Sequence, residues 1–171
     1  MRLPRGMTLV ELLVVLAVIG ILLGLGVPAW SAMMRANQLA TATNNLVAAI
    51  TLARVEAVRS GHRATFCASL DGVTCTTLGY HHGWIVFRDT DGDTYRDPNE
   101  PILASGGPVE GVSIHGNHPV VRMISYTPLG QPKTAGGAFQ AGSLFVCKGR
   151  YGRRLVLSPA GRLRIEHTAC S

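Results

Sequence analysis

The residues best suited to chemistry in this sequence are basic ones near its carboxyl end. Arg162 and Arg164 follow a turn at Pro159 and stand two apart, so on one strand they would point to one face, with Leu163 and Ile165 facing the core. The planar guanidinium of arginine forms paired hydrogen bonds with phosphate oxygens. This pair therefore predicts a binding site for a polyanion such as nucleic acid or anionic lipid. Four further basic residues could extend it: Lys148, Arg150, Arg153 and Arg154.

The charge distribution along the chain favours a polyanionic partner. The net charge is +6, and residues 71–110 hold seven acidic and two basic side chains, whereas residues 122–171 hold one acidic and eight basic side chains. A basic patch binds duplex DNA through its phosphate backbone, without sequence preference. The alternative is that these arginines pair across strands, for example Arg153 with Glu166, or are solvated charges that protect a sheet edge.

A second group of charged residues has the spacing of a calcium-binding loop. Counting from Asp89, carboxylates occupy positions 1, 3, 5, 9 and 12, and Tyr95 at position 7 would offer its carbonyl. Position 6 is Thr94, where such loops have glycine, and the flanking residues favour strands over helices. Calcium binding is therefore weighed against a solvated turn. The calcium ligands would be Asp89, Asp91, Asp93, Asp97 and Glu100.

Four cysteines lie beyond residue 60, and none forms a C-x-x-C pair or has a histidine at zinc-finger spacing. An even number in an exported domain indicates disulfide bonds in an oxidising compartment. Three pairings are possible. We favour Cys67–Cys75, which closes a short loop, together with Cys147–Cys170, which ties down the last strand. Four reduced thiols are the alternative.

No pattern of catalytic residues stands out. The six histidines lack the H-E-x-x-H spacing of zinc hydrolases, and no nucleophile elbow, phosphate-binding loop or dinucleotide fingerprint occurs. We therefore expect a protein that is not an enzyme and that has no certain cofactor, with calcium as the one candidate.

The elements that must position these residues begin with a long apolar segment. Only 15% of the 171 residues are charged, and residues 12–27 are all Leu, Val, Ile, Ala or Gly. Residues 7–30 can cross about 30 Å of hydrocarbon, and because only one such segment exists, polytopic transporters and channels are excluded. Glu11 lies within it. An unpaired carboxylate there costs about 2.5–3.5 kcal/mol, so it requires a partner or a function.

An amphipathic pattern continues this segment and then gives way to strands. Residues 31–60 contain no proline or glycine, and apolar residues recur at three- and four-residue steps, so one helix is expected over about 8–60. Two helices broken at Pro28 are the alternative. The apolar stripe is Leu39, Ala42, Leu46, Ile50, Ala53 and Ala57. After Gly61 the period becomes two, and the candidate strands are 63–69, 83–88, 111–115, 120–127, 142–148, 153–158 and 161–167.

No helical pattern interrupts these strands, so the sheet is expected to be mostly antiparallel. The fold class is therefore α+β: a long amino-terminal helix packed on a β-sandwich or a curled sheet.

The amino terminus resembles the class III leader of type IV pilin-like proteins. Two arginines precede Gly6, and residues 7–11 (Met-Thr-Leu-Val-Glu) open the apolar helix; Met7 departs from the phenylalanine usual in the family. The resemblance implies that a prepilin peptidase cuts between Gly6 and Met7 and methylates the new amine. It also implies that Glu11 neutralises the amino terminus of a neighbouring subunit, and that Pro28 is the helix proline of the family.

Three later stretches resemble FimT/GspH-type minor pilins, so the resemblance covers nearly the whole chain. They are the acidic turn within residues 88–103, residues 126–130 (Tyr-Thr-Pro-Leu-Gly) and the closing residues 154–164. Gly161-Arg162-x-Arg164 matches an element linked with DNA binding in FimT-like pilins of naturally transformable bacteria. The resemblance implies a pilin-like organisation: leader 1–6, transmembrane and filament-core helix 7–30, amphipathic continuation 31–60, and a β-rich head, residues 61–171.

The expected function is that of a minor pilin or pseudopilin of a type IV pilus or a related type II secretion-like filament, which binds DNA during uptake. Its partners would be other pilins, through the amino-terminal helix, the prepilin peptidase, an inner-membrane assembly platform and double-stranded DNA. It would lie in the bacterial inner membrane as a single-pass protein with a periplasmic head. The alternatives are a type II secretion pseudopilin of the protein H type, a minor pilin that only primes assembly, and a secreted binding domain whose mature chain starts near Met33.

Overall fold

The computed structural model describes residues 8–170, without the side chains of residues 25–29. Helix α1 spans Leu9–Ser60 and passes through Pro28, which confirms the prediction of one helix and excludes a break there. A short 3-10 helix, η1, spans Tyr80–His82. The strands are β1 (Arg63–Ala68), β2 (Trp84–Asp89), β3 (Ile102–Gly106), β4 (Ser113–Gly116), β5 (Met123–Tyr126), β6 (Gly142–Lys148), β7 (Tyr151–Leu157) and β8 (Leu163–Ala169).

The chain divides into two compact units between Asn37 and Gln38. In the first unit the large apolar side chains of α1 from Leu9 to Leu23 are exposed. Within the part of the chain that the structure describes, no helix combines the length and the hydrophobicity that crossing a bilayer demands. The second unit contains the rest of α1 and all of the described strands.

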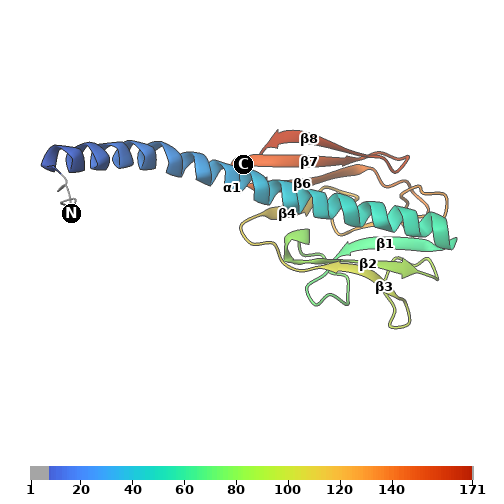
Figure 1. Ribbon diagram of the computed structural model, residues 1–171. Helices are drawn as coiled ribbons and strands as arrows, with labels where there is room; N and C mark the ends of the chain where they lie inside the picture. Colours follow the sequence, from blue (N-terminus) through green and yellow to red (C-terminus); the bar gives the residue numbers. More distant parts are fainter. Residues whose placement is uncertain (1–7, 171) are drawn as a thin grey trace. The chain divides into compact units, whose positions relative to one another are not determined.

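Two four-stranded antiparallel sheets make up the β-rich head, as predicted. Their strand orders are β3-β2-β1-β5 and β4-β6-β7-β8. In Figure 1 the second half of α1 runs alongside both sheets. Seven of the eight strands overlap predicted ones, and β6 coincides with the prediction of 142–148. Strand β3 was not predicted because Ala, Ser and Gly are weak strand formers, and it forms by pairing with β2.

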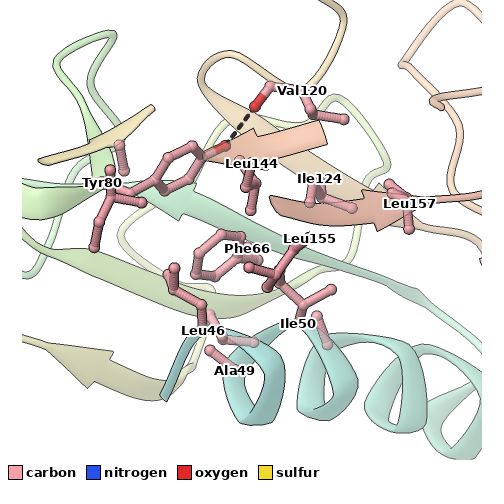
Figure 2. Packing of buried hydrophobic residues seen from close by; sticks show 14 of the residues in the cluster. Leu46, Ala49, Ile50, Phe66, Tyr80, Val120, Ile124, Leu144, Leu155 and Leu157 are labelled. Atoms are coloured by element: carbon pink, nitrogen blue, oxygen red, sulfur yellow. Dashed lines mark hydrogen bonds between the residues drawn. The ribbon is translucent and has the colours of Figure 1, made fainter. Parts of the chain in front are cut away.

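The predicted apolar stripe of α1 forms one side of the hydrophobic core. Its six members are all buried: Leu39, Ala42, Leu46, Ile50, Ala53 and Ala57. Figure 2 shows Leu46 and Ile50 beside Phe66 of β1 and Leu155 of β7. Because one cluster contains side chains from the helix and from both sheets, the helix fixes the position of each sheet.

Aromatic side chains anchor η1 to the same core. Tyr80 stacks on Phe66 with ring centroids 5.0 Å apart, and its hydroxyl donates a hydrogen bond to Val120 O at 2.9 Å (Figure 2). Burial raises the pKa of Tyr80, so the hydroxyl remains a protonated donor. This bond fastens the segment before β5 over the core.

Glu56 joins α1 to the first sheet. Its side chain is only 5% exposed, and its carboxylate accepts hydrogen bonds from Arg59 Nη2 at 2.7 Å and from Arg88 Nη2 of β2 at 2.5 Å. These guanidinium groups, Arg59 foremost, lower the pKa of Glu56 although burial acts in the opposite direction. The carboxylate is therefore charged at neutral pH and bridges the helix and the strand.

Candidate nucleic-acid interface

The turn between β7 and β8 presents one of the two principal arginines. Ser158 N donates to Arg162 O and Gly161 N to Ser158 O, both at 2.9 Å, and Arg162 N donates to Ser158 Oγ at 3.1 Å. Gly161 has φ +78°, a left-handed conformation that is costly for residues with a Cβ. The local sequence thus fixes the turn, and Arg162 is exposed at its end.

Arg54 of α1, which sequence reasoning missed, holds this turn against the helix. Its Nη1 donates to Gly161 O at 3.0 Å and its Nη2 to Ala160 O at 3.1 Å. A Cβ on Gly161 or on Gly130 would come within 3.3 Å of Arg54 Nε, so both glycines leave room for the guanidinium. Both partners of Arg54 are backbone carbonyls more than a hundred residues away, so no sequence pattern marks it.

A groove of about 270 Å³ opens beside Arg54, between α1 and the turn. Val47 and Thr51 line its helix side, and Tyr126 and Arg162 line the sheet side. Burial raises the pKa of the Tyr126 hydroxyl to about 12, against the opposing charge of Arg54. Two of the stretches that resemble the family therefore meet around Arg54, namely residues 126–130 and 154–164.

The register of the second sheet determines where its basic side chains point. Leu155 and Leu157 of β7 belong to the core, so the residues that alternate with them lie on the opposite face of the β4-β6-β7-β8 sheet, here called the outer face. Val156 pairs with Arg164, which places Arg164 on the outer face near the turn. Arg162 precedes the first residue of β8, so the prediction that both arginines stand on one strand is wrong.

Ile165 pairs with Leu155 and therefore stands on the core-facing side of the sheet, as predicted, but 49% of the residue is exposed. β8 is the last strand of its sheet, so a side chain in its middle has a neighbouring strand on one side only. Leu163, at the start of the strand, does pack against the core.

Arg154 lies on the outer face but is paired within the sheet. Its guanidinium forms an ion pair with Glu166 of β8, and this contact lowers the pKa of Glu166. The predicted pairing of Arg153 with Glu166 is wrong, because Arg153 lies on the other face, in register with His167. One of the alternatives to DNA binding, cross-strand pairing, thus holds for Arg154.

Lys148 and Arg150 belong to the hairpin between β6 and β7, at the far end of the sheet. A seven-residue strand separates them from the β7–β8 turn, a distance of about 20 Å. The six predicted DNA-binding residues therefore do not form one continuous patch. Arg162 and Arg164 lie together at one end, and Lys148 and Arg150 at the other.

Both predicted disulfides are present. Within the Cys67–Cys75 loop, the backbone amides of Thr74 and Val73 donate to Asp71 at 2.7 and 2.8 Å and hold the pKa of that carboxyl well below its usual range. The Cys147–Cys170 bond joins β6 to the residue after β8. It crosses β7 at Gly152, where a Cβ would collide with Cys170 Sγ.

The structure brings three of the five predicted calcium ligands together. Carboxylate oxygens of Asp89, Asp91 and Asp93 lie within 4.8 Å of one another, with Asp89 buried and the other two exposed. Glu100 is buried, and its carboxylate accepts hydrogen bonds from two backbone amides of the loop at 2.5 and 3.1 Å. It closes the loop, and neither Glu100 nor Asp97 belongs to the group of three.

Asp89 has an unusual environment for a surface-loop carboxylate. It accepts hydrogen bonds from Gly92 N at 2.7 Å and Thr94 N at 3.1 Å. Burial raises its pKa to about 6, and the charges of Glu100 and Asp91 act in the same direction. Thr94 has φ +71°, the left-handed conformation that glycine supplies at position 6 of a calcium loop. The loop thus departs from that pattern in residue type and not in backbone conformation at this position. Calcium binding stays a prediction.

Of the residues predicted to act in processing and assembly, Gly6 and Met7 lie outside the described residues. Glu11 is exposed near the start of α1, and its backbone N donates to Thr8 Oγ1 at 3.3 Å. Pro28 lies within α1, and its side chain is outside the description. Their predicted roles stay predictions.

Comparison with known proteins gives matches over most of the chain. Residues 42–161 match the protein family described as "Type II transport protein GspH", and residues 1–27 match the prokaryotic N-terminal methylation motif. The chain is 32% identical over 173 residues to the pilin-like protein PilA1 of Thermus thermophilus, covering 95% of this chain and 98% of that protein.

Solved structures share the fold at lower identity. The type IV minor pilin FimU of Pseudomonas aeruginosa matches with a TM-score of 0.61 and 18% identity, covering 81% of this chain and 97% of that one. The minor pseudopilin EpsH from the type 2 secretion system of Vibrio cholerae matches with a TM-score of 0.52 and 14% identity, covering 76% and 97%.

Proposed function

Since the chain belongs to the GspH family, and is a type IV minor pilin or pseudopilin of the FimT/GspH type, we propose that its head binds duplex DNA through the β7–β8 turn. A member of this family is a structural filament subunit and not an enzyme. We propose that the head makes this contact while a type IV filament takes up DNA.

One observation carries this proposal: Arg162 and Arg164 are both exposed beside a turn held rigid by Arg54. The ion pairs found among the described residues involve Arg59, Arg88 and Arg154, and neither Arg162 nor Arg164 takes part in them. Two guanidinium groups on a fixed support suit the phosphate oxygens of a DNA backbone. Contacts of this kind carry no sequence information.

Replacing Arg162 and Arg164 with alanine is expected to weaken duplex binding about tenfold or more. Each arginine that neutralises a phosphate also releases counterions, so without the two arginines the slope of log K against log salt should fall by about 1.8 in magnitude. The measurement is fluorescence anisotropy of a labelled duplex with the full chain in neutral detergent micelles, between about 50 and 200 mM salt.

A matched control removes two positive charges elsewhere on the head. Arg122→Ala with Lys133→Ala changes the net charge equally, and their side chains lie against Tyr95 and Phe139 and not on the second sheet. This double variant should bind duplex DNA nearly as the wild type does. Equal losses in the two double variants would mean that net charge, and not the β7–β8 turn, governs binding.

The proposed assembly follows the family. A prepilin peptidase would cut between Gly6 and Met7, and the anchor helix, residues 7–30, would hold the protein in the inner membrane until an assembly platform transfers it to a filament. There Glu11 would neutralise a neighbouring amino terminus and Pro28 would act as the helix proline. Mass spectrometry of the mature protein should find an N-methylated Met7, and a chain starting near Met33 would contradict the anchor.

A second candidate function is that of a type II secretion pseudopilin, or of a minor pilin that only primes assembly, without DNA binding. The family description over residues 42–161 and the fold shared with EpsH favour it. Under this alternative the wild-type chain has no measurable affinity for DNA at low salt, so the anisotropy experiment separates the two functions.

The carboxylates of Asp89, Asp91 and Asp93 are proposed as ligands of a calcium ion. Because a calcium ligand must be deprotonated and the pKa of Asp89 is about 6, affinity should be about tenfold weaker at pH 5 than at pH 7.5. Calorimetric titration of the full chain with calcium chloride measures this. Asp97→Asn, outside the group of three, is the control, and absence of heat at pH 7.5 would end the calcium hypothesis.

A further inference from the structure

The outer face of the second sheet carries an aromatic pair that the turn-based contact does not use. His115 of β4 and Phe145 of β6 are cross-strand partners, and their rings stack with centroids 5.4 Å apart and planes inclined by 17°. The same row continues across the sheet to Arg154 of β7, the partner of Phe145, and then to Glu166. His115 is exposed and Phe145 is half-buried.

A groove of about 320 Å³ opens beside this pair. It is lined by Ser113, His115 and Phe145 and by the Cys147–Cys170 disulfide. Its size lies at the lower end of the range for small-molecule pockets, about 300–1,000 Å³. One nucleotide fits such a space, whereas a duplex, whose bases are stacked inside, does not reach its aromatic wall.

Positive charge flanks the groove. Arg150 is exposed in the β6–β7 hairpin next to Gly149, which also lines the groove, and its carbonyl accepts a hydrogen bond from Cys170 N at 3.2 Å. Arg154 adjoins Phe145 on the other side, with Glu166 offsetting part of its charge. Stacking surfaces combined with a cationic border are the arrangement with which proteins bind single-stranded nucleic acid.

We infer that this groove binds an unpaired nucleotide of single-stranded DNA, with its base on Phe145 and His115 and a neighbouring phosphate at Arg150. The inference rests on the proposed function and deepens it. The β7–β8 turn holds the backbone, and on the same sheet the groove takes a base that is not paired, at Phe145, whose partner Arg154 lies three residues before the end of β7. Frayed or single-stranded ends of incoming DNA are therefore preferred over blunt duplex.

The test compares Phe145→Ala with the wild type, using the full chain in neutral detergent micelles and labelled single strands and blunt duplexes of equal length. Affinity for the single strand should fall about tenfold and affinity for the duplex should stay unchanged, because only an unpaired base stacks on the ring. Phe145→Leu, which keeps the bulk of the side chain, should show the same loss, and Phe145→Trp should retain affinity. Phe139→Ala removes an exposed ring elsewhere on the head and should change neither affinity.

The outcomes separate this inference from the proposed function. If the wild type binds duplex and the Phe145 variants leave single-strand affinity unchanged, the groove is not a nucleotide site and the proposed function stands. A single-strand affinity that Phe145→Leu retains would equally overturn base stacking. If the wild type binds neither form of DNA, the proposed function fails and the inference fails with it.

Discussion

Replacing Glu56 with alanine is expected to lower the free energy of unfolding by about 3 kcal/mol, at the low end of the range for breaking a buried ion pair. The low end applies because Arg88 is 32% exposed and Arg59 is 69% exposed, so both guanidinium groups regain some water. What is lost is the carboxylate that links the helix to β2. Denaturation by guanidinium chloride measures the change, followed by tryptophan fluorescence, since Trp84 packs against the core.

Glu166→Ala is the matched control for this prediction. It also removes a glutamate paired with an arginine, but the two side chains, those of Arg154 and Glu166, are 44% and 37% exposed, so its cost should stay below about 1 kcal/mol. The difference between wild type and Glu56→Ala should also depend on pH. Because the pKa of Glu56 is lowered from 4.5 in the folded protein, its contribution is present above that value and is lost as the pH falls below it. A difference that persists unchanged at pH 2 would contradict the ion-pair explanation.

Replacing Gly161 with alanine is expected to lower the free energy of unfolding by about 2–5 kcal/mol, the sum of backbone strain and overpacking. The residue has φ +78°, and an added Cβ would lie 2.5 Å from Gly130 O and 3.0 Å from a ring carbon of Tyr126. Neither neighbour is the free end of a flexible side chain, so the turn itself must move. The hydrogen bonds from Arg54 should weaken with it.

Comparison with Gly149→Ala separates the cost of backbone strain from the cost of the steric clash at Gly161. Gly149 also has a positive φ, +58°, but an added Cβ would meet nothing within 4 Å, so only the conformational cost of about 1–2 kcal/mol remains. Thermal denaturation of both variants gives the comparison. Equal shifts in their melting temperatures would show that the crowding around Arg54 contributes nothing to stability.

Periodicity was sufficient to predict the elements that pack against one another. The stripe from Leu39 to Ala57 is buried throughout, because three- and four-residue spacing leaves a helix one way to face a core. The disulfides were also predicted, since a short loop and a terminal strand each had a cysteine within reach. Strand β3 was not predicted because its residues have little strand preference. It forms because it pairs with β2.

The candidate interface was predicted less completely, for a different physical reason. Sequence places Arg150, Arg154 and Arg164 close together, but strand alternation and the length of β7 distribute them over opposite ends and pair Arg154 with Glu166. Arg54 donates to distant backbone carbonyls, which every residue type has, so the sequence contains no pattern that predicts these contacts. The groove beside Phe145 likewise depends on a cross-strand partner, His115, that lies thirty residues earlier.

Strand β8 is the outermost strand of its sheet, and both of its ends are tied to other elements. Cys170, just past one end, is bonded covalently to β6, and the turn before the other end is hydrogen-bonded to α1 through Arg54. A tensile load on a filament unzips an edge strand most easily from a loose end, and this strand has none. The same two attachments hinder β8 from leaving its own sheet and joining that of an adjacent subunit, so crowded copies should resist exchanging strands while they wait to be assembled.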